Sequence, residues 1–145
     1  MLNRLFDVPY HQLKNFPQAN MFNTKVDGQW QSLSTQEFLQ QAMRLSKALH
    51  HMGVAAGDRI AVASSNRYEW NVLDIAVQQV GAILVPLYPT ISAKDYAYIL
   101  NDCAAEYMFV GNQEIADKIN EVKPQLSRLK EVFSFDSLPN TTSWN

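Results

Sequence analysis

The chain has 145 residues, 47% of them hydrophobic, which suits one soluble globular domain with a buried core. Its 12 basic and 14 acidic side chains give a formal net charge of −2, so we expect no nucleic-acid partner. Cys103 is the single cysteine, which excludes an internal disulfide and suits a reducing compartment such as the cytoplasm. No run reaches the ~18 apolar residues of a spanning helix, so we expect no transmembrane segment.

Residues 1–33 are predicted to form an N-terminal arm and a short hairpin. Up to about Asn23, prolines, amides and scattered aromatic side chains follow no sustained period, which predicts an irregular arm on the surface. Asp27 and Gly28 then separate two stretches that can extend. This pair favours the positive φ angles of a tight hairpin turn.

A first helix is predicted to begin after Ser34, because Glu37 three residues later completes a capping box. Gly53 ends this helix, since glycine tolerates the left-handed conformation that follows a last helical turn. The apolar face recurs with a helical period and comprises Phe38, Ala42, Leu45, Leu49 and Met52.

Four short apolar runs follow, and each shows little polar alternation, as expected for strands covered on both faces. They lie at residues 60–63, 82–85, 107–110 and 132–135. Pro86 and Pro89 are expected to stop the second run, because proline lacks the backbone N–H of a sheet ladder.

Predicted helices separate these runs. Two of them begin with a capping side chain and an acid three residues later, Asn66 with Glu69 and Ser92 with Asp95, and a weaker helix spans about 113–123. The alternation predicts an α/β subdomain over residues 34–138, with a Rossmann-like or flavodoxin-like, doubly wound, mainly parallel sheet and flanking helices. Residues 139–145 are predicted to be a polar tail, either disordered or the point of a truncation.

The loop after the first strand holds the candidates for cofactor binding. Ser64, Ser65 and Arg67 combine hydroxyls and a guanidinium at a helix start, where backbone amides favour a phosphate. The loop has no glycine that lets the backbone approach a pyrophosphate, and Asn66 suits a helix cap. A structural role for this loop is therefore favoured over ligand binding.

Candidates for substrate binding are Trp70, Tyr88 and Thr90. Trp70 can line an acyl pocket, but an aromatic side chain on the first turn of such a helix more often packs against its sheet. Tyr88 and Thr90 belong to a stretch stiffened by prolines, which can present side chains or simply turn the chain. We predict no catalytic residue and no metal site, because no His, Cys, Asp and Glu grouping has the required spacing.

Several segments, in this order, resemble long-chain fatty-acid CoA ligases of the adenylate-forming, AMP-binding superfamily. They are residues 33–35, 53–60, 66–70, 74–76 and 81–90. The Tyr-Pro-Thr sequence that begins at Tyr88 resembles the long-chain members, whereas Tyr68 stands where many relatives have proline. The resemblance implies that the chain is an N-terminal subdomain of a larger fold.

The same resemblance implies the chemistry of the intact enzyme. Such a ligase activates a fatty acid with ATP and Mg²⁺ to an acyl-adenylate and then transfers the acyl group to CoA. Its Ser/Thr/Gly-rich phosphate loop and its C-terminal lysine have no counterpart in these 145 residues, so no cofactor is expected for this chain alone. The implied partners are the rest of the ligase N-terminal domain and its C-terminal domain, in the cytoplasm or at a membrane surface.

The leading hypothesis is therefore an N-terminal ligase fragment that is inactive by itself. A first alternative is a stand-alone α/β module that binds a nucleotide or phosphate ester at Ser64–Arg67. A second alternative is an interaction element that forms homo-oligomers, because a sheet separated from its later partners exposes edges and apolar surface.

Overall fold

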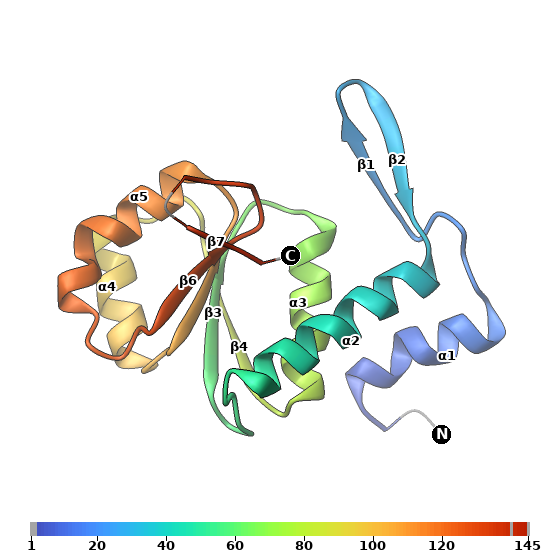
Figure 1. Cartoon of the computed structure of the whole chain (residues 1–145), viewed down its shortest axis with the longest axis horizontal. Helices are drawn as coiled ribbons and strands as arrows, with labels where there is room; N and C mark the ends of the chain where they lie inside the picture. The colour runs from blue at the N-terminus through green and yellow to red at the C-terminus, as the bar shows by residue number, and fades with distance from the viewer. Residues whose placement is uncertain (1–2, 140, 145) are drawn as a thin grey trace. The chain divides into compact units, whose positions relative to one another are not determined.

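A computed structural model describes residues 3–139 and 141–144 of the chain (Figure 1). The chain forms two compact units. The helical unit comprises Met1–Val54 and Arg67–Val80, and the sheet unit comprises Ala55–Asn66 and Gly81–Asn145. The predicted divisions after residues 33 and 138 coincide with neither boundary and stay a prediction.

The helical unit begins with regular structure where an irregular arm was predicted. A short 3₁₀ helix, η1 (Leu5–Asp7), leads directly into α1 (Val8–Asn15). Pro9 occupies the first turn of α1, where the missing N–H has no helical acceptor to lose. The prediction therefore needs correction over residues 5–15, because Pro9 starts a helix there instead of interrupting one.

The predicted hairpin is confirmed. Strands β1 (Phe22–Val26) and β2 (Gln29–Leu33) pair antiparallel, and Asp27 and Gly28 form the two-residue turn with φ angles of 49° and 79°. At the base of the hairpin, the Phe22 ring lies 5.3 Å from that of Phe38, centroid to centroid. This contact ties the hairpin to the helix that follows it.

The next helix, α2 (Thr35–His51), starts with the predicted capping box. The Ser34 hydroxyl accepts from the Glu37 backbone N–H at 3.2 Å, and the Glu37 carboxylate accepts from the Ser34 backbone N–H at 2.8 Å. Gly53 follows the helix with φ 88°, as expected for a glycine at this position.

In the helical unit α2 packs against α3 (Tyr68–Gln79). The predicted cap at Asn66 is wrong, because the extended residue before the helix is Arg67, and its side chain makes no capping hydrogen bond. Asn66 itself belongs to the sheet unit. Asn66 and Glu69 therefore form no capping box, and Glu69 pairs with Arg67 instead, as described below.

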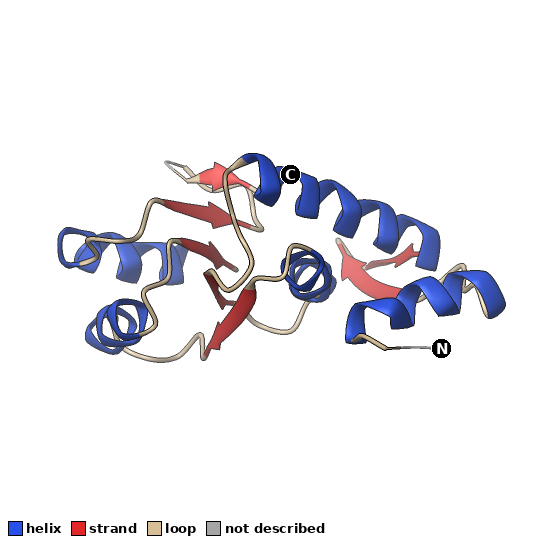
Figure 2. Cartoon of the chain, turned by 90° about the horizontal axis from the view of Figure 1, so that it is seen from below, coloured by secondary structure: helices blue, strands red, loops and turns tan. Residues whose placement is uncertain are grey.

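Five parallel strands form the sheet, in the order β4-β3-β5-β6-β7. They are β3 (Arg59–Ala63), β4 (Ile83–Leu87), β5 (Tyr107–Val110), β6 (Glu131–Ser134) and β7 (Thr142–Ser143). Two helices of the same unit, α4 (Ala93–Asp102) and α5 (Gln113–Val122), lie side by side on one side of the sheet (Figure 2). A 3₁₀ turn, η2 (Lys123–Gln125), follows α5. The predicted α/β fold with a parallel sheet is confirmed.

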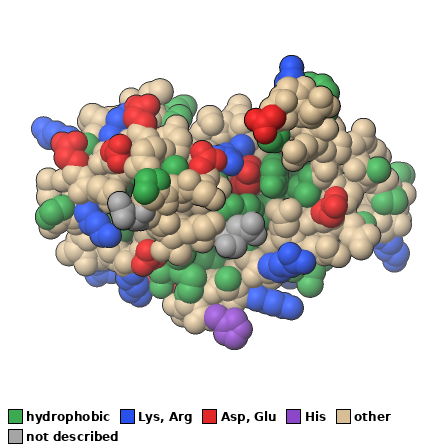
Figure 3. Space-filling view, turned by 45° about the horizontal axis from the view of Figure 1, so that its top comes forward, with side chains coloured by type: hydrophobic (Ala, Val, Ile, Leu, Met, Phe, Trp, Pro, Cys, Tyr) green, Lys and Arg blue, Asp and Glu red, His purple; other side chains and the backbone are tan. Residues whose placement is uncertain are grey.

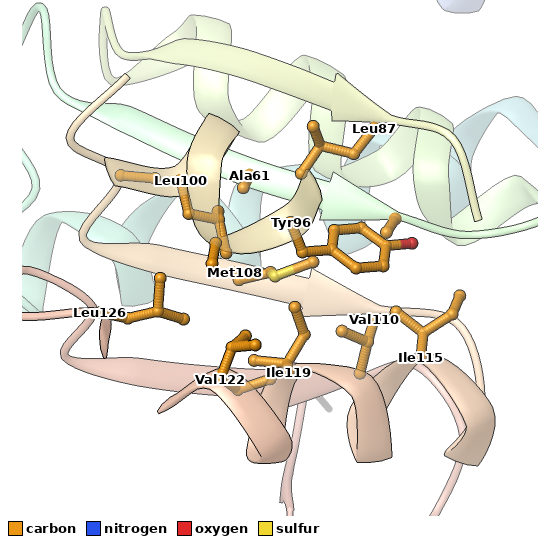
Figure 4. Packing of buried hydrophobic residues seen from close by; sticks show 14 of the residues in the cluster. Ala61, Leu87, Tyr96, Leu100, Met108, Val110, Ile115, Ile119, Val122 and Leu126 are labelled. Atoms are coloured by element: carbon orange, nitrogen blue, oxygen red, sulfur yellow. The ribbon is translucent and has the colours of Figure 1, made fainter. Parts of the chain in front are cut away.

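The core of the sheet unit lies between the strands and these two helices (Figure 4). The helices contribute Tyr96 and Leu100 from α4 and Ile119 from α5, and β5 contributes Met108 and Val110. All five side chains are buried. Packing of this continuous apolar layer stabilises the sheet unit along the length of its strands.

Pro86 does not end its strand, contrary to the prediction, because β4 continues to Leu87. β4 is an edge strand, and the Ile83 N–H donates to the Asp58 carbonyl on the inner side. Since successive residues of a strand direct their N–H groups to opposite sides, the Pro86 nitrogen faces away from β3. The missing donor therefore costs no hydrogen bond of the sheet.

The predicted tail, of which residues 140 and 145 lie outside the described residues, contains an element where none was predicted. Thr142 and Ser143 form β7 beside β6, and the Trp144 backbone N–H donates to the Ser134 carbonyl at 3.1 Å. The Trp144 ring meets the Phe135 ring edge to face at 5.5 Å. A two-residue strand in a polar stretch has no sequence period, so only its tertiary partner reveals it.

Candidate functional site

The loops after β3, β4 and β5 leave the sheet at its carboxyl edge, where parallel sheets bind ligands. Four predicted candidates lie on these loops: Ser64 and Ser65 after β3, and Tyr88 and Thr90 after β4. Arg67 and Trp70 belong to the helical unit. The structure therefore brings four of the six candidates to one edge of one unit.

The point between β3 and β5 is where the strand order reverses, since β4 lies on the other side of β3. Doubly wound sheets commonly leave a crevice for a ligand there. In this chain Ser64 fills that place: a methyl group on Gly111 would lie 2.5 Å from the Ser64 Oγ and 3.0 Å from its Cα. The Gly111 N–H also donates to the Ala63 carbonyl at 2.9 Å.

The Ser64 hydroxyl is engaged within its own loop, because it donates to the Ser65 carbonyl at 2.8 Å. A close approach of Ser64 to Gly111 leaves no room for a side chain at residue 111. Together these contacts favour packing over phosphate binding at Ser64. Sequence reasoning missed the role of Gly111, although a glycine just after a buried strand is a signal of close backbone approach.

Arg67 pairs with Glu69 in the helical unit. Its Nε donates to Glu69 Oε2 at 2.9 Å and its Nη2 donates to Oε1 at 2.7 Å, so the contact is bidentate. The side chains are 22% and 11% exposed. A phosphate would have to compete with this carboxylate for the guanidinium, which weakens the case for Arg67 as a cofactor ligand.

This ion pair was not predicted, because residues two apart do not face each other on a helix. Arg67 has extended backbone angles just before α3, so its side chain can reach Glu69 on the first turn. The carboxylate also lies near the positive end of the helix dipole. Next to it, burial raises the pKa of the Tyr68 hydroxyl, and the negative charge of Glu69 adds to that effect.

Grooves of the helical unit lie beside the hairpin and beside α1. The first, of about 270 Å³, lies between the hairpin and the first turn of α3, and Thr24, Gln31 and Tyr68 help to line it. The second, of about 220 Å³, is mostly apolar, and its lining includes Leu5 and Phe38. Both are smaller than the ~300 to 1,000 Å³ of typical ligand sites.

Trp70 lines neither of these two grooves among the residues described in the structure. It lies on α3, is half-buried, and precedes the fully buried pair Val72 and Leu73. A partly exposed tryptophan fits neither a closed acyl pocket nor a fully buried core position. Its assignment as a substrate-binding residue stays a prediction.

The loop after β4 is hydrogen-bonded to a side chain of α4. The Tyr96 hydroxyl donates to the Tyr88 carbonyl at 2.9 Å, whereas the Tyr88 side chain is 79% exposed. Burial, and then the charge of Glu114, raise the pKa of Tyr96 to about 12, so its hydroxyl stays protonated under ordinary conditions. Thr90 is exposed on the same loop. The bond of Tyr96 to the loop was not predicted, because it joins a helix side chain to a backbone carbonyl eight residues earlier.

The distribution of charged side chains and of potential metal ligands concerns the described part of the chain. On the face shown in Figure 3, acidic and basic side chains are interspersed, in keeping with the small net charge. Within residues 3–139 and 141–144, no cluster of three or more His, Cys, Asp and Glu side chains is placed to hold a metal ion. None of the helices described there has the length and apolar character needed to cross a membrane.

Comparisons with known proteins give a consistent family. A family model described as "AMP-binding enzyme" matches residues 10–145. The long-chain-fatty-acid–CoA ligase FadD15 of Mycobacterium bovis is 34% identical over 116 residues, which are 80% of this chain and 19% of that protein. The chain thus spans about a fifth of the length of this curated relative.

Solved structures agree with this family. A protein described as a candidate long-chain-fatty-acid CoA ligase from Rhodopseudomonas palustris superimposes with a TM-score of 0.82 and 30% identity, over 97% of this chain and 35% of that one. The anthranilate CoA ligase AuaEII, in complex with anthranoyl-AMP, gives a TM-score of 0.81 over 97% of this chain and 26% of its own. Its identity of 22% supports a shared fold alone.

Proposed function

Because this chain belongs to the family of AMP-binding enzymes, we propose that it forms the N-terminal part of an ATP-dependent long-chain fatty-acid CoA ligase. The observation that carries the proposal is the family match over residues 10–145, supported by 34% identity to a ligase of that class. In this reaction the fatty-acid carboxylate attacks the α-phosphorus of ATP, and pyrophosphate leaves. The CoA thiol then attacks the acyl carbon, loses its proton, and displaces AMP.

We further propose that these 145 residues are inactive by themselves. The hydroxyl of Ser64 bonds within its own loop, and the guanidinium of Arg67 is paired with Glu69. The grooves of about 270 and 220 Å³ in the helical unit are smaller than a typical ligand site. ATP, Mg²⁺ and CoA are in this proposal held by the longer enzyme, and no catalytic residue is assigned here.

The partners in this proposal are the rest of the ligase N-terminal domain and its C-terminal domain, since the relative is about five times as long as the matched region. We place the ligase in the cytoplasm, where a single unpaired cysteine such as Cys103 suits reducing conditions, with a membrane surface as a second location for a lipid substrate. The role assigned to this chain is to supply a scaffold.

The test is acyl-CoA formation by the purified chain with ATP, Mg²⁺, CoA and a long-chain fatty acid, measured by mass spectrometry. A chimaera in which this chain replaces the matching region of the mycobacterial ligase serves as the comparison. We expect product from the chimaera and none from the isolated chain. Turnover by the isolated chain would overturn its inactivity, and a folded but inactive chimaera would count against the ligase proposal.

Two other functions have their own readouts. A thermal shift with AMP or CoA that is lost on Ser64→Ala would favour a stand-alone nucleotide or phosphate-ester module. Association that increases with concentration in sedimentation would favour an interaction element, for which the exposed Ile83 on the edge strand is the motivating feature. The position of Pro86 argues against strand addition at that edge, because it removes an outward-facing donor.

A further inference from the structure

The loop between β4 and α4 is fixed at both of its ends. β4 remains paired with β3 up to Leu87, which lies opposite Ala63. At the other end Ser92 forms a capping box with Asp95, whose carboxylate accepts from the Ser92 hydroxyl at 2.6 Å. Only residues 88–91 lie between the strand ladder and the helix cap. A contact between these four residues and the core would therefore limit their conformation.

That contact comes from Tyr96. Its ring is fully buried among Leu87, Val110 and Ile115 (Figure 4), and its hydroxyl donates to the Tyr88 carbonyl at 2.9 Å. Tyr88 is the first residue after the β3–β4 ladder ends. The hydroxyl of a core side chain thus supplies a hydrogen bond just where the sheet ceases to supply one.

Tyr88 combines an exposed side chain with a backbone carbonyl that is hydrogen-bonded to a buried tyrosine. Tyr88 is 79% exposed although the Tyr96 hydroxyl, from the core, donates to its backbone carbonyl. Pro86 and Pro89 flank it and restrict the backbone further. A large aromatic side chain on a fixed backbone at the carboxyl edge of a parallel sheet is well placed to meet a ligand or another part of a protein.

We propose that Tyr96 is a positioning residue, whose hydroxyl holds the loop of residues 88–91 and so fixes the backbone that carries the Tyr88 ring at the carboxyl edge of the sheet. This inference does not depend on the proposed ligase function. A purely structural Tyr96 would fill the core with its ring, and its hydroxyl would be dispensable for the loop. The two roles separate because Tyr96→Phe keeps the ring and removes only the donor.

The experiment compares backbone amide order parameters in the full 145-residue chain, its Tyr96→Phe variant, and a Tyr98→Phe control. Tyr98 lies on the same helix but is 70% exposed, so its hydroxyl has no such buried role. We expect the order parameters of Tyr88, Thr90 and Ile91 to fall from about 0.85 to below about 0.6 in Tyr96→Phe, because the loop loses its hydrogen bond to the core. Order parameters in α4 and β5 should not change, and the control should match the wild type.

No change in the loop, or an equal fall in the order parameters throughout α4 and β5, would overturn the proposal. The wild-type protein alone gives a second test that needs no variant to fold. The amides of Tyr88, Thr90 and Ile91 should then be as rigid as those of α4, with order parameters of about 0.85. Values below about 0.6 at these three amides would show that the Tyr96 hydroxyl does not hold the loop.

Discussion

Replacing Gly111 with alanine tests whether protein atoms fill the place between β3 and β5. The added methyl group would lie 2.5 Å from the Ser64 Oγ, 2.9 Å from its Cβ and 3.0 Å from its Cα. The hydroxyl can rotate away, although it then loses its bond to the Ser65 carbonyl. The Cα atom belongs to the backbone, so the loop after β3 or the end of β5 must move.

The expected cost follows from this geometry. Overpacking of a well-packed interior lowers the free energy of unfolding by about 1 to 3 kcal/mol. Because one of the three contacts is to backbone, we expect Gly111→Ala to fall in the upper half of that range, at about 2 to 3 kcal/mol. Ser64→Gly removes the two nearest atoms and should restore about 1 kcal/mol or more of the loss.

The assay is urea unfolding of the wild type, both single variants and the double variant. Gly57→Ala is the matched control in the same unit, because Gly57 has a positive φ of 89° but nothing within 4 Å of an added methyl group. The free energy of unfolding that Gly57→Ala loses should be the same with and without Ser64→Gly. The packing argument is refuted if Gly111→Ala is as stable as the wild type, or if the losses from Gly111→Ala and Ser64→Gly simply add.

Three further predictions concern other parts of the chain. The pKa of Glu37 is lowered from 4.5 by hydrogen bonds from Ser34, so its stabilising effect is complete above pH 4.5 and is lost as the pH falls through the lowered pKa. Glu37→Gln should therefore flatten the decline in the urea midpoint between about pH 6 and about pH 3, and an unchanged slope would contradict this. Pro86→Ala should lower the free energy of unfolding by no more than about 1 kcal/mol, because no sheet hydrogen bond involves that nitrogen. A loss near ~3 kcal/mol would contradict the position of the Pro86 nitrogen on the outer side of the edge strand. Ile119→Ala should cost about 2 to 5 kcal/mol in the same assay, since Ile119 is fully buried between α5 and the sheet, and a loss below about 1 kcal/mol would argue against that core.

Most of the fold could be predicted from short-range sequence patterns. The capping boxes that begin at Ser34 and Ser92 and the turn at Asp27 and Gly28 each depend on residues within three positions of one another, and the structure confirms all of them. The parallel sheet was equally visible, because strands buried on both faces are apolar throughout. The start of α1 was missed since Pro9 can either begin or break a helix, and sequence alone does not say which.

The site depended on contacts that no short-range pattern records. Ser64 meets Gly111 across 47 positions of sequence, and the Tyr96 hydroxyl finds a carbonyl eight residues away across a helix start. Arg67 and Glu69 pair only because Arg67 precedes the helix in an extended conformation. The assignment of the loop residues to binding stays a prediction, and the sequence could not tell that the Ser64 hydroxyl and the Arg67 guanidinium were already engaged within the protein.

The most direct measurement for a scaffold that does not itself hold a nucleotide is equilibrium dialysis of the purified chain against labelled ATP with Mg²⁺. We predict no saturable binding up to about 1 mM ATP, where a weak but specific site would already be half filled. Binding of one ATP per chain with micromolar affinity, abolished by Ser64→Ala or Arg67→Ala, would contradict the assignment of these residues to structural roles.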